Sequence, residues 1–228
     1  MKTVLFWDID GTLLTTGKAG VPAWEAAVKE VTGKDFELSS IRVPGLTDFQ
    51  IAKRTFELVG VSGTDEDVAR MVSRYEDMLP STLPSKKGRV LPNVREILDV
   101  LAGRSDVRSY LLTGNTRRGA RAKLTHYNLL QYFSDGAFAE DQGSRSSIAA
   151  RALELARRLG PIDEEQIFVI GDTPHDVECA TAINARTIAV ATGGYSIAEL
   201  TAHHPWRVFE ELPPPDEFLD LIGLLTTA

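Results

Sequence analysis

Four aspartates in two short motifs are the side chains of this sequence best suited to chemistry. Asp8 and Asp10 belong to the letters DIDGT, and Asp172 and Asp176 belong to the letters GDTPHD. One such motif alone could merely cap a helix or shape a turn, because Asp, Thr and Gly favour both places. Four carboxylates brought together would repel one another, and such crowding usually marks a metal site or a proton-transfer site. We therefore expect one of these two kinds of site wherever the fold unites the motifs.

The elements that must position these motifs are short apolar runs without strict alternation, a pattern typical of strands buried on both faces. The expected strands are Thr3–Ile9, Arg108–Leu112, Gly136–Ala139, Gln166–Ile170, Thr187–Ala191 and Arg207–Phe209. The helical patterns between and after them are Val94–Leu101, Ile148–Leu159, Pro174–Ile183, Ile197–Thr201 and Asp216–Leu225. Such alternation predicts an α/β fold with a doubly wound, Rossmann-like, mainly parallel sheet. Ligands of these sheets bind beyond the carboxyl ends of the strands, where both acidic motifs and Thr113 stand.

The segment between the first strand and the rest of the sheet has a different pattern, that of three amphipathic helices. Their apolar faces are Trp24, Ala27, Val28 and Val31, then Phe49, Ala52, Phe56 and Val59, then Val68, Met71, Val72, Tyr75 and Leu79. Pro80 and Pro84 predict a linker back to the sheet. We expect a core domain of residues 1–15 and 88–228, and a small all-helical cap domain of residues 16–87 over the open end of the sheet.

The combination of motifs resembles the haloacid dehalogenase superfamily. The letters DIDGT, a threonine at the end of a later strand (Thr113) and the letters GDTPHD are similar to its signature motifs in order and spacing. The helical insert resembles the C1-type cap of that superfamily. The letters PGLTD at 44–48 and TGGYS at 192–196 are similar to its phosphoglycolate phosphatase-like branch. The resemblance implies a phosphatase that uses Mg²⁺.

The resemblance also implies a role for each acidic residue. Asp8 would be the nucleophile and form an aspartyl-phosphate, and Asp10 would protonate the leaving alcohol and later activate water. Asp8, Asp172 and the main-chain carbonyl of Asp10 would bind Mg²⁺, which prefers a few carboxylates together with water and phosphate oxygens. Asp176 would hold a metal-bound water or orient a positive side chain. An acid at position 10 favours phosphate esters, because dehalogenases of the superfamily lack it.

The phosphate group needs hydrogen-bond donors and a positive side chain. Thr113 would donate its hydroxyl, and the N–H groups of Gly114 and Asn115 lie near the start of a helix, a favourable place for an anion. The superfamily usually supplies a lysine before the GDTPHD strand, but no lysine follows Lys123 in this sequence. Arg145 stands at the expected spacing, and Arg151 and Lys123 remain as alternatives.

The residues that would meet the rest of the substrate are less well defined. Lys18 follows the first motif, where the superfamily has a mobile flap. Arg42, Thr47 and Asp48 are candidates for a specificity loop on the cap. His175 could contact the cap or the substrate, although a surface position at a helix start is the simpler explanation.

Composition limits the partners and the location. The formal net charge of −7 disfavours nucleic acid and anionic lipid as partners. No apolar run reaches the roughly 18 residues that span a bilayer, and no secretory signal is evident. Cys179 is the single cysteine, so no intramolecular disulfide can form. We expect a cytoplasmic monomer or homodimer acting on a small-molecule phosphate ester.

Two other functions remain open at this stage. A phosphomutase would need the same Asp8 and Asp10 but would pass the phosphoryl group to a substrate hydroxyl instead of water. A non-catalytic binding module is less well supported, because every acidic position that the chemistry requires is filled. The identity of the phosphate ester does not follow from the fold.

Overall fold

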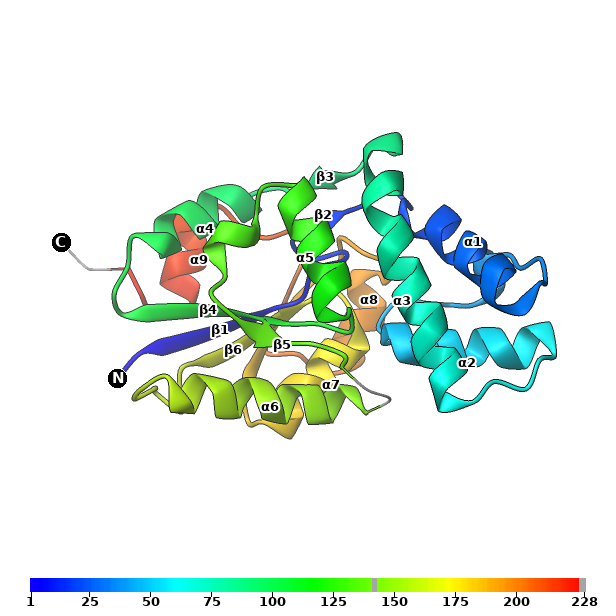
Figure 1. The fold of residues 1–228 in the computed structure, drawn as a ribbon. Helices are drawn as coiled ribbons and strands as arrows, with labels where there is room; N and C mark the ends of the chain where they lie inside the picture. The colour runs from blue at the N-terminus through cyan, green and yellow to red at the C-terminus, as the bar shows by residue number, and fades with distance from the viewer. Residues whose placement is uncertain (141–142, 226–228) are drawn as a thin grey trace.

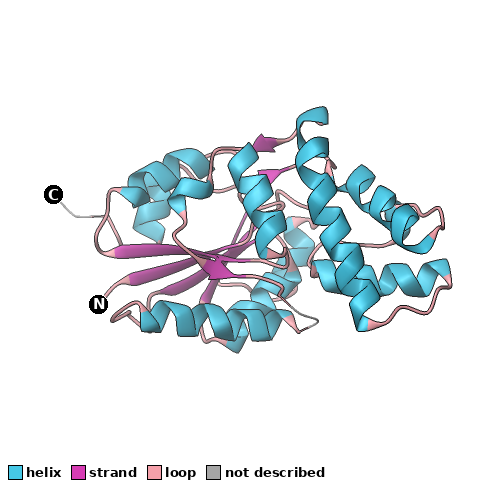
Figure 2. Ribbon diagram, viewed as in Figure 1, coloured by secondary structure: helices cyan, strands magenta, loops and turns pink. Residues whose placement is uncertain are grey.

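The chain folds around a six-stranded sheet whose strands are all parallel, as seen in a computed structural model that describes residues 1–140 and 143–225 (Figures 1 and 2). The strands are β1 (Thr3–Trp7), β4 (Val107–Leu112), β5 (Gly136–Ala137), β6 (Ile167–Gly171), β7 (Arg186–Val190) and β8 (Arg207–Phe209). Their order in space is β5-β4-β1-β6-β7-β8. The predicted α/β fold is therefore confirmed, and each of the six expected strands forms.

Helices cover both faces of the sheet. On one face lie α4 (Val94–Ala102), α5 (Arg117–His126) and α9 (Pro215–Leu221), and on the other lie α6 (Arg145–Arg158) and α7 (Pro174–Ala182) (Figure 1). The short helix α8 (Ile197–Thr201) follows β7. Side chains of β1 alternate between the two cores, with Leu5 and Trp7 in one and Val4 and Phe6 in the other. This explains why the strand is apolar from Val4 to Trp7.

Three further helices lie beyond one end of the sheet: α1 (Gly20–Thr32), α2 (Asp48–Val59) and α3 (Asp65–Thr82) (Figure 1). They share a hydrophobic cluster of their own, in which the rings of Trp24 and Tyr75 meet edge to face at a centroid distance of 5.0 Å. We refer to these helices and their connecting loops as the cap. The boundaries 16 and 87 stay a prediction.

The connections between the cap and the sheet differ in two ways from what the sequence suggested. Two short strands, β2 (Leu14–Thr15) and β3 (Arg89–Val90), pair antiparallel and join the entry and exit of the cap. Pro80 does not start the linker but lies in the last turn of α3, and the chain leaves through a 3₁₀ turn at Leu83–Ser85. A proline this close to a helix end removes only one backbone hydrogen bond. The buried Leu79 helps hold that turn in place.

Within the described residues, no helix combines the length and the apolar character required to cross a bilayer.

Candidate active site

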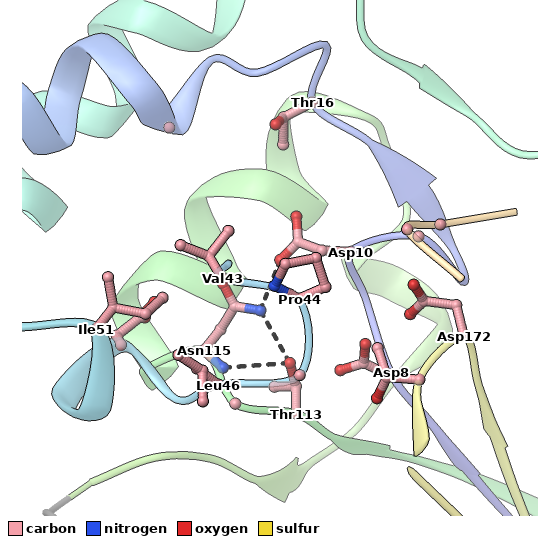
Figure 3. A pocket seen from close by; sticks show the side chains of 18 of the residues that line it. Asp8, Asp10, Thr16, Val43, Pro44, Leu46, Ile51, Thr113, Asn115 and Asp172 are labelled. Carbon is pink, nitrogen blue, oxygen red and sulfur yellow. Dashed lines mark hydrogen bonds between the residues drawn. The ribbon is translucent and has the colours of Figure 1, made fainter. Parts of the chain in front are cut away.

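The carboxyl ends of three neighbouring strands meet at the floor of a cavity beneath the cap. Asp8 follows β1, Thr113 follows β4 and Asp172 follows β6, and β1 lies between the other two strands. The cavity measures about 450 Å³ and is lined by residues of both the core and the cap. Figure 3 shows Asp8, Thr113 and Asp172 on its core side. Three segments that are far apart in sequence thus supply one site, as the motifs predicted.

Three buried carboxylates form a compact cluster on this floor. One oxygen from each of Asp8, Asp172 and Asp176 can be chosen so that all lie within 4.8 Å of one another. Burial, and then the charge of Asp176, raise the pKa of Asp8 from its usual 3.8 to about 7. Burial and the neighbouring Asp8 likewise raise the pKa of Asp172. Oxygen donors that repel one another in this way are the donor set that suits a divalent cation such as Mg²⁺, so the residues present fit this ion.

Asp176 is placed to orient a cation rather than to face the cavity. Its Oδ2 accepts hydrogen bonds from the backbone N–H and the hydroxyl of Thr173, at 3.0 and 2.7 Å. Its Oδ1 accepts a hydrogen bond of 2.5 Å from Arg145 Nη2. Both oxygens therefore have partners, and Asp176 does not line the cavity. Of the two roles considered for this residue, the geometry favours orienting a positive side chain.

Arg145 is that positive side chain. It is the first residue of α6, capped by Ser144, and its Nη1 lies 4.0 Å from Asp8 Oδ1. Burial alone would lower its pKa, but the charges of Asp176 and Asp8 outweigh burial and raise it, so the guanidinium stays charged. Arg151, the first alternative, instead donates to the carbonyl of Phe138 at 2.8 Å.

The segment after β4 provides the polar wall next to Asp8. Thr113 is fully buried, and its hydroxyl accepts hydrogen bonds from the backbone N–H and the side-chain amide of Asn115, at 3.3 and 2.9 Å. At Gly114, a Cβ would lie 2.8 Å from Arg145 Nη1 and 2.8 Å from the carbonyl of Leu46. Only glycine lets the loop approach both the cation and the cap this closely.

Lys123, the second alternative for the cation, lies in the cavity but beside a different carboxylate. Its ammonium donates to Asp10 Oδ2 at 2.5 Å and to Asn115 Oδ1 at 2.6 Å. The amide of Asn115 donates to the same Asp10 oxygen at 2.8 Å (Figure 3). Burial would lower the pKa of Lys123, but the nearby Asp10 more than compensates and raises it. Among the described residues, two buried cations thus line the site: Arg145 beside Asp8, and Lys123 beside Asp10.

The remaining candidates from the sequence fall into two groups. Lys18 and Asp48 line the cavity, Lys18 exposed and Asp48 buried with its Oδ2 accepting from the backbone N–H of Thr116 at 2.9 Å. Thr47 does not line it, because its hydroxyl caps α2 by accepting from the backbone N–H of Gln50. Substrate contact through the Thr47 side chain therefore has no support in the structure.

The last two candidates, Arg42 and His175, also lie away from the cavity. The guanidinium of Arg42 stacks 4.5 Å from the ring centroid of Tyr195. His175 lies at the start of α7 with its Nδ1 3.0 Å from Glu178. Neither Arg42 nor His175 lines the cavity.

The motifs did not predict two contacts to Asp172. The hydroxyl of Thr12 donates to Asp172 Oδ1 at 3.4 Å. A Cβ on Gly193 would lie 1.7 Å from Asp172 Oδ2, so the loop after β7 closes this side of the cluster. The paired glycines of the letters TGGYS were the available signal, since such pairs allow close backbone approach.

Comparison with known proteins identifies the family. The profile of the family described as "Haloacid dehalogenase-like hydrolase" matches residues 4–190. The chain belongs to this family. The match covers the cap of this haloacid dehalogenase-like hydrolase and the strand ends that carry Asp8, Thr113 and Asp172.

Individual relatives of this family member are distant in sequence. It is 25% identical to "Probable phosphatase IndB" of Dickeya dadantii over 98% of this chain and 93% of that protein. A predicted phosphoglycolate phosphatase from Haemophilus somnus has a TM-score of 0.72 at 16% identity, covering 98% and 97% of the two chains. CbbY from Rhodobacter sphaeroides, solved in complex with phosphate, has a TM-score of 0.73 at 16% identity, covering 92% and 95%. The structural matches show the fold, and the family and the phosphatase relative indicate that the chain is a phosphatase enzyme.

Proposed function

We propose that this enzyme hydrolyses small-molecule phosphomonoesters through an aspartyl-phosphate on Asp8, with Mg²⁺ as cofactor. The observation that carries the proposal is the cluster of Asp8, Asp172 and Asp176 beside Arg145 at the floor of the cavity. Phosphoryl transfer needs an in-line nucleophile and positive charge on the phosphate oxygens, and these residues can provide both.

Each residue can be given one task. Asp8 attacks the phosphorus atom and becomes the acyl phosphate, while the alcohol oxygen leaves on the opposite side. Arg145 neutralises phosphate charge, oriented by Asp176. Thr113 and the N–H groups of Gly114 and Asn115 bind the phosphate oxygens.

Asp10 is the acid and base of the proposal. It gives a proton to the departing alkoxide, and then takes one from the water that hydrolyses the acyl phosphate. Its side chain is 42% exposed towards the cavity and is held by Lys123 and Asn115. There it would meet the alcohol oxygen of a bound substrate.

Asp8 and Asp172 would hold Mg²⁺, with the main-chain carbonyl of Asp10 as a third ligand. Bound there, the ion would supply positive charge to the phosphate oxygens and to the crowded carboxylates. Asp176 would act behind them through Arg145.

Release of inorganic phosphate tests the proposal. We would screen a panel of phosphomonoesters with wild-type protein in Mg²⁺ and in chelator, alongside Asp8→Asn and Asp10→Asn. Phosphate release that requires Mg²⁺ and is lost in Asp8→Asn supports it. Turnover by Asp8→Asn at the wild-type rate contradicts it, and an isomerised ester without phosphate release would indicate a phosphomutase instead.

A further inference from the structure

The cavity has two chemically different halves. The core half contains Asp8, Asp10, Asp172 and Arg145. The cap half is lined mainly by apolar side chains, namely Val21, Leu38, Val43, Pro44, Leu46 and Ile51. Figure 3 shows Val43, Pro44, Leu46 and Ile51 grouped on the other side of the cavity from Asp8 and Asp172. A phosphate bound over Asp8 would direct the rest of its ester towards this apolar group.

Three of the polar side chains that line the cap half have partners within the protein. The indole Nε1 of Trp24 donates to the hydroxyl of Thr55 at 3.2 Å. The carboxylate of Asp48 accepts from the backbone of the core, as described above. Lys123 is buried and committed to Asp10 and Asn115, so it could bind a substrate carboxylate only by releasing them. The cation left for a substrate in this half is Lys18, which is exposed.

These features disfavour two common kinds of ester. A sugar has several hydroxyl groups, and burying them against apolar walls without partners is costly. A carboxylate such as that of phosphoglycolate would meet the same walls with a full charge. The cavity, at about 450 Å³, is also of the size that holds a whole organic ligand, far more than a two-carbon acid fills.

We propose that the preferred substrates are phosphate monoesters of predominantly apolar alcohols, whose carbon chain packs against Val43, Leu46 and Ile51. This inference rests on the phosphatase activity proposed above and specifies its substrate class. Burial of hydrocarbon supplies the discrimination, so affinity grows with the apolar area of the alcohol.

A homologous series isolates this effect. We would measure kcat/KM for phosphate release with Mg²⁺ from n-alkyl phosphates, ethyl to hexyl, together with phosphoglycolate and glucose 6-phosphate. The alkyl leaving groups differ little in basicity, so the chemical step stays nearly constant along the series. Each methylene should raise kcat/KM about fourfold until the chain outgrows the cavity. Binding of the matching n-alkylphosphonates, whose C–P bond is not a substrate for ester hydrolysis, should tighten by the same factor in calorimetry.

Two variants and a matched control locate the effect. Val43→Asn lies in a loop, and Ile51→Asn lies on α2, so one can be read if the other fails to fold. Each should reduce the dependence on chain length to less than about twofold per methylene, because a polar side chain replaces part of the apolar wall. Leu58→Asn is the control, since Leu58 is on the same helix, is 58% exposed and does not line the cavity. It should keep the wild-type dependence.

The outcomes separate this inference from the proposed function. Alkylphosphonate affinities that do not change with chain length, or phosphoglycolate or glucose 6-phosphate as the best substrate, would overturn the inference while leaving the phosphatase activity intact. A chain-length dependence of binding without phosphate release from any ester would overturn the proposed function instead.

Discussion

The affinity for Mg²⁺ should fall steeply as the pH is lowered from 8 to 5. Asp8 must be ionised to bind the ion, and its pKa in the metal-free protein is raised to about 7, mainly by burial. At pH 8 most Asp8 is already ionised, whereas at pH 5, two pH units below that pKa, about one molecule in a hundred is. Asp8 alone should therefore weaken apparent binding about a hundredfold, or about 2.7 kcal/mol. Asp172, whose pKa is also raised, adds to the loss in the same direction.

The raised pKa of Asp8 also makes the stability of the metal-free protein depend on pH. Folded Asp8 holds its proton more tightly than unfolded Asp8, whose pKa is near the usual 3.8. Its contribution to the free energy of unfolding is therefore fully present below pH 3.8 and is lost as the pH rises to about 7. Mg²⁺ should accordingly raise the melting temperature much more at pH 8 than at pH 5.

Isothermal titration calorimetry at pH 5, 6, 7 and 8 and constant ionic strength measures this dependence. Asp8→Asn should reduce the pH dependence to the part that comes from Asp172, because the amide does not titrate. Asp48→Asn is the matched control: Asp48 lines the same cavity and burial raises its pKa to about 6, but it lies outside the cluster, so the pH dependence should persist. Equal Mg²⁺ affinity at pH 5 and pH 8 in the wild type would refute the reasoning.

Three further changes give separate outcomes. Arg145→Met should lower kcat about a hundred- to a thousandfold, as loss of a donor to a transferring group does. Arg151→Met, which removes a hydrogen bond to a backbone carbonyl, should keep kcat within a few-fold of wild type. Equal losses of kcat in phosphate-release assays of the two variants would contradict this. Lys123→Met should release Asp10 and slow hydrolysis of alkyl phosphates about a hundredfold. It should slow p-nitrophenyl phosphate far less, because that leaving group needs no proton, and a uniform loss across both esters would argue for a purely structural lysine. Cys179 is fully buried with its pKa raised to about 12, so the native protein should not react with a thiol reagent at pH 8, and rapid labelling before unfolding would contradict its burial.

The strand ends were predictable because the signal there is local. An apolar run followed by Asp or Thr-Gly marks both a buried strand and the polar loop after it, which is how Asp8, Thr113 and Asp172 were placed together. The choice of Arg145 used the resemblance to the superfamily together with spacing, and the ion pair with Asp176 agrees with it.

Other features depend on packing that the local sequence does not encode. The helix α5 has few apolar residues, so its periodicity did not predict that Lys123 is buried. A lysine paired with Asp10 across the fold has the same sequence appearance as a solvated lysine. The capping role of Thr47 was in principle visible, since Gln50 three residues later completes a capping box.

The cap residues that line the cavity were likewise only partly predictable from the sequence. The amphipathic pattern of α2 predicted a buried face, but it did not reveal that Ile51 at the helix edge lines the cavity. Which apolar residues face a ligand depends on how the cap sits on the core. That arrangement includes a hydrogen bond of 3.0 Å from the backbone N–H of Asp48 to the carbonyl of Gly114.

Trapping the acyl phosphate tests the central claim most directly. Protein quenched in acid during turnover with Mg²⁺ should carry one phosphoryl group. Borohydride reduction should convert the phosphorylated residue 8 to homoserine, which peptide mass spectrometry would detect. Chelator and Asp8→Asn should both abolish the label. Phosphate release at the full rate with no modification of Asp8, or with the label on another residue, would contradict covalent capture by this aspartate.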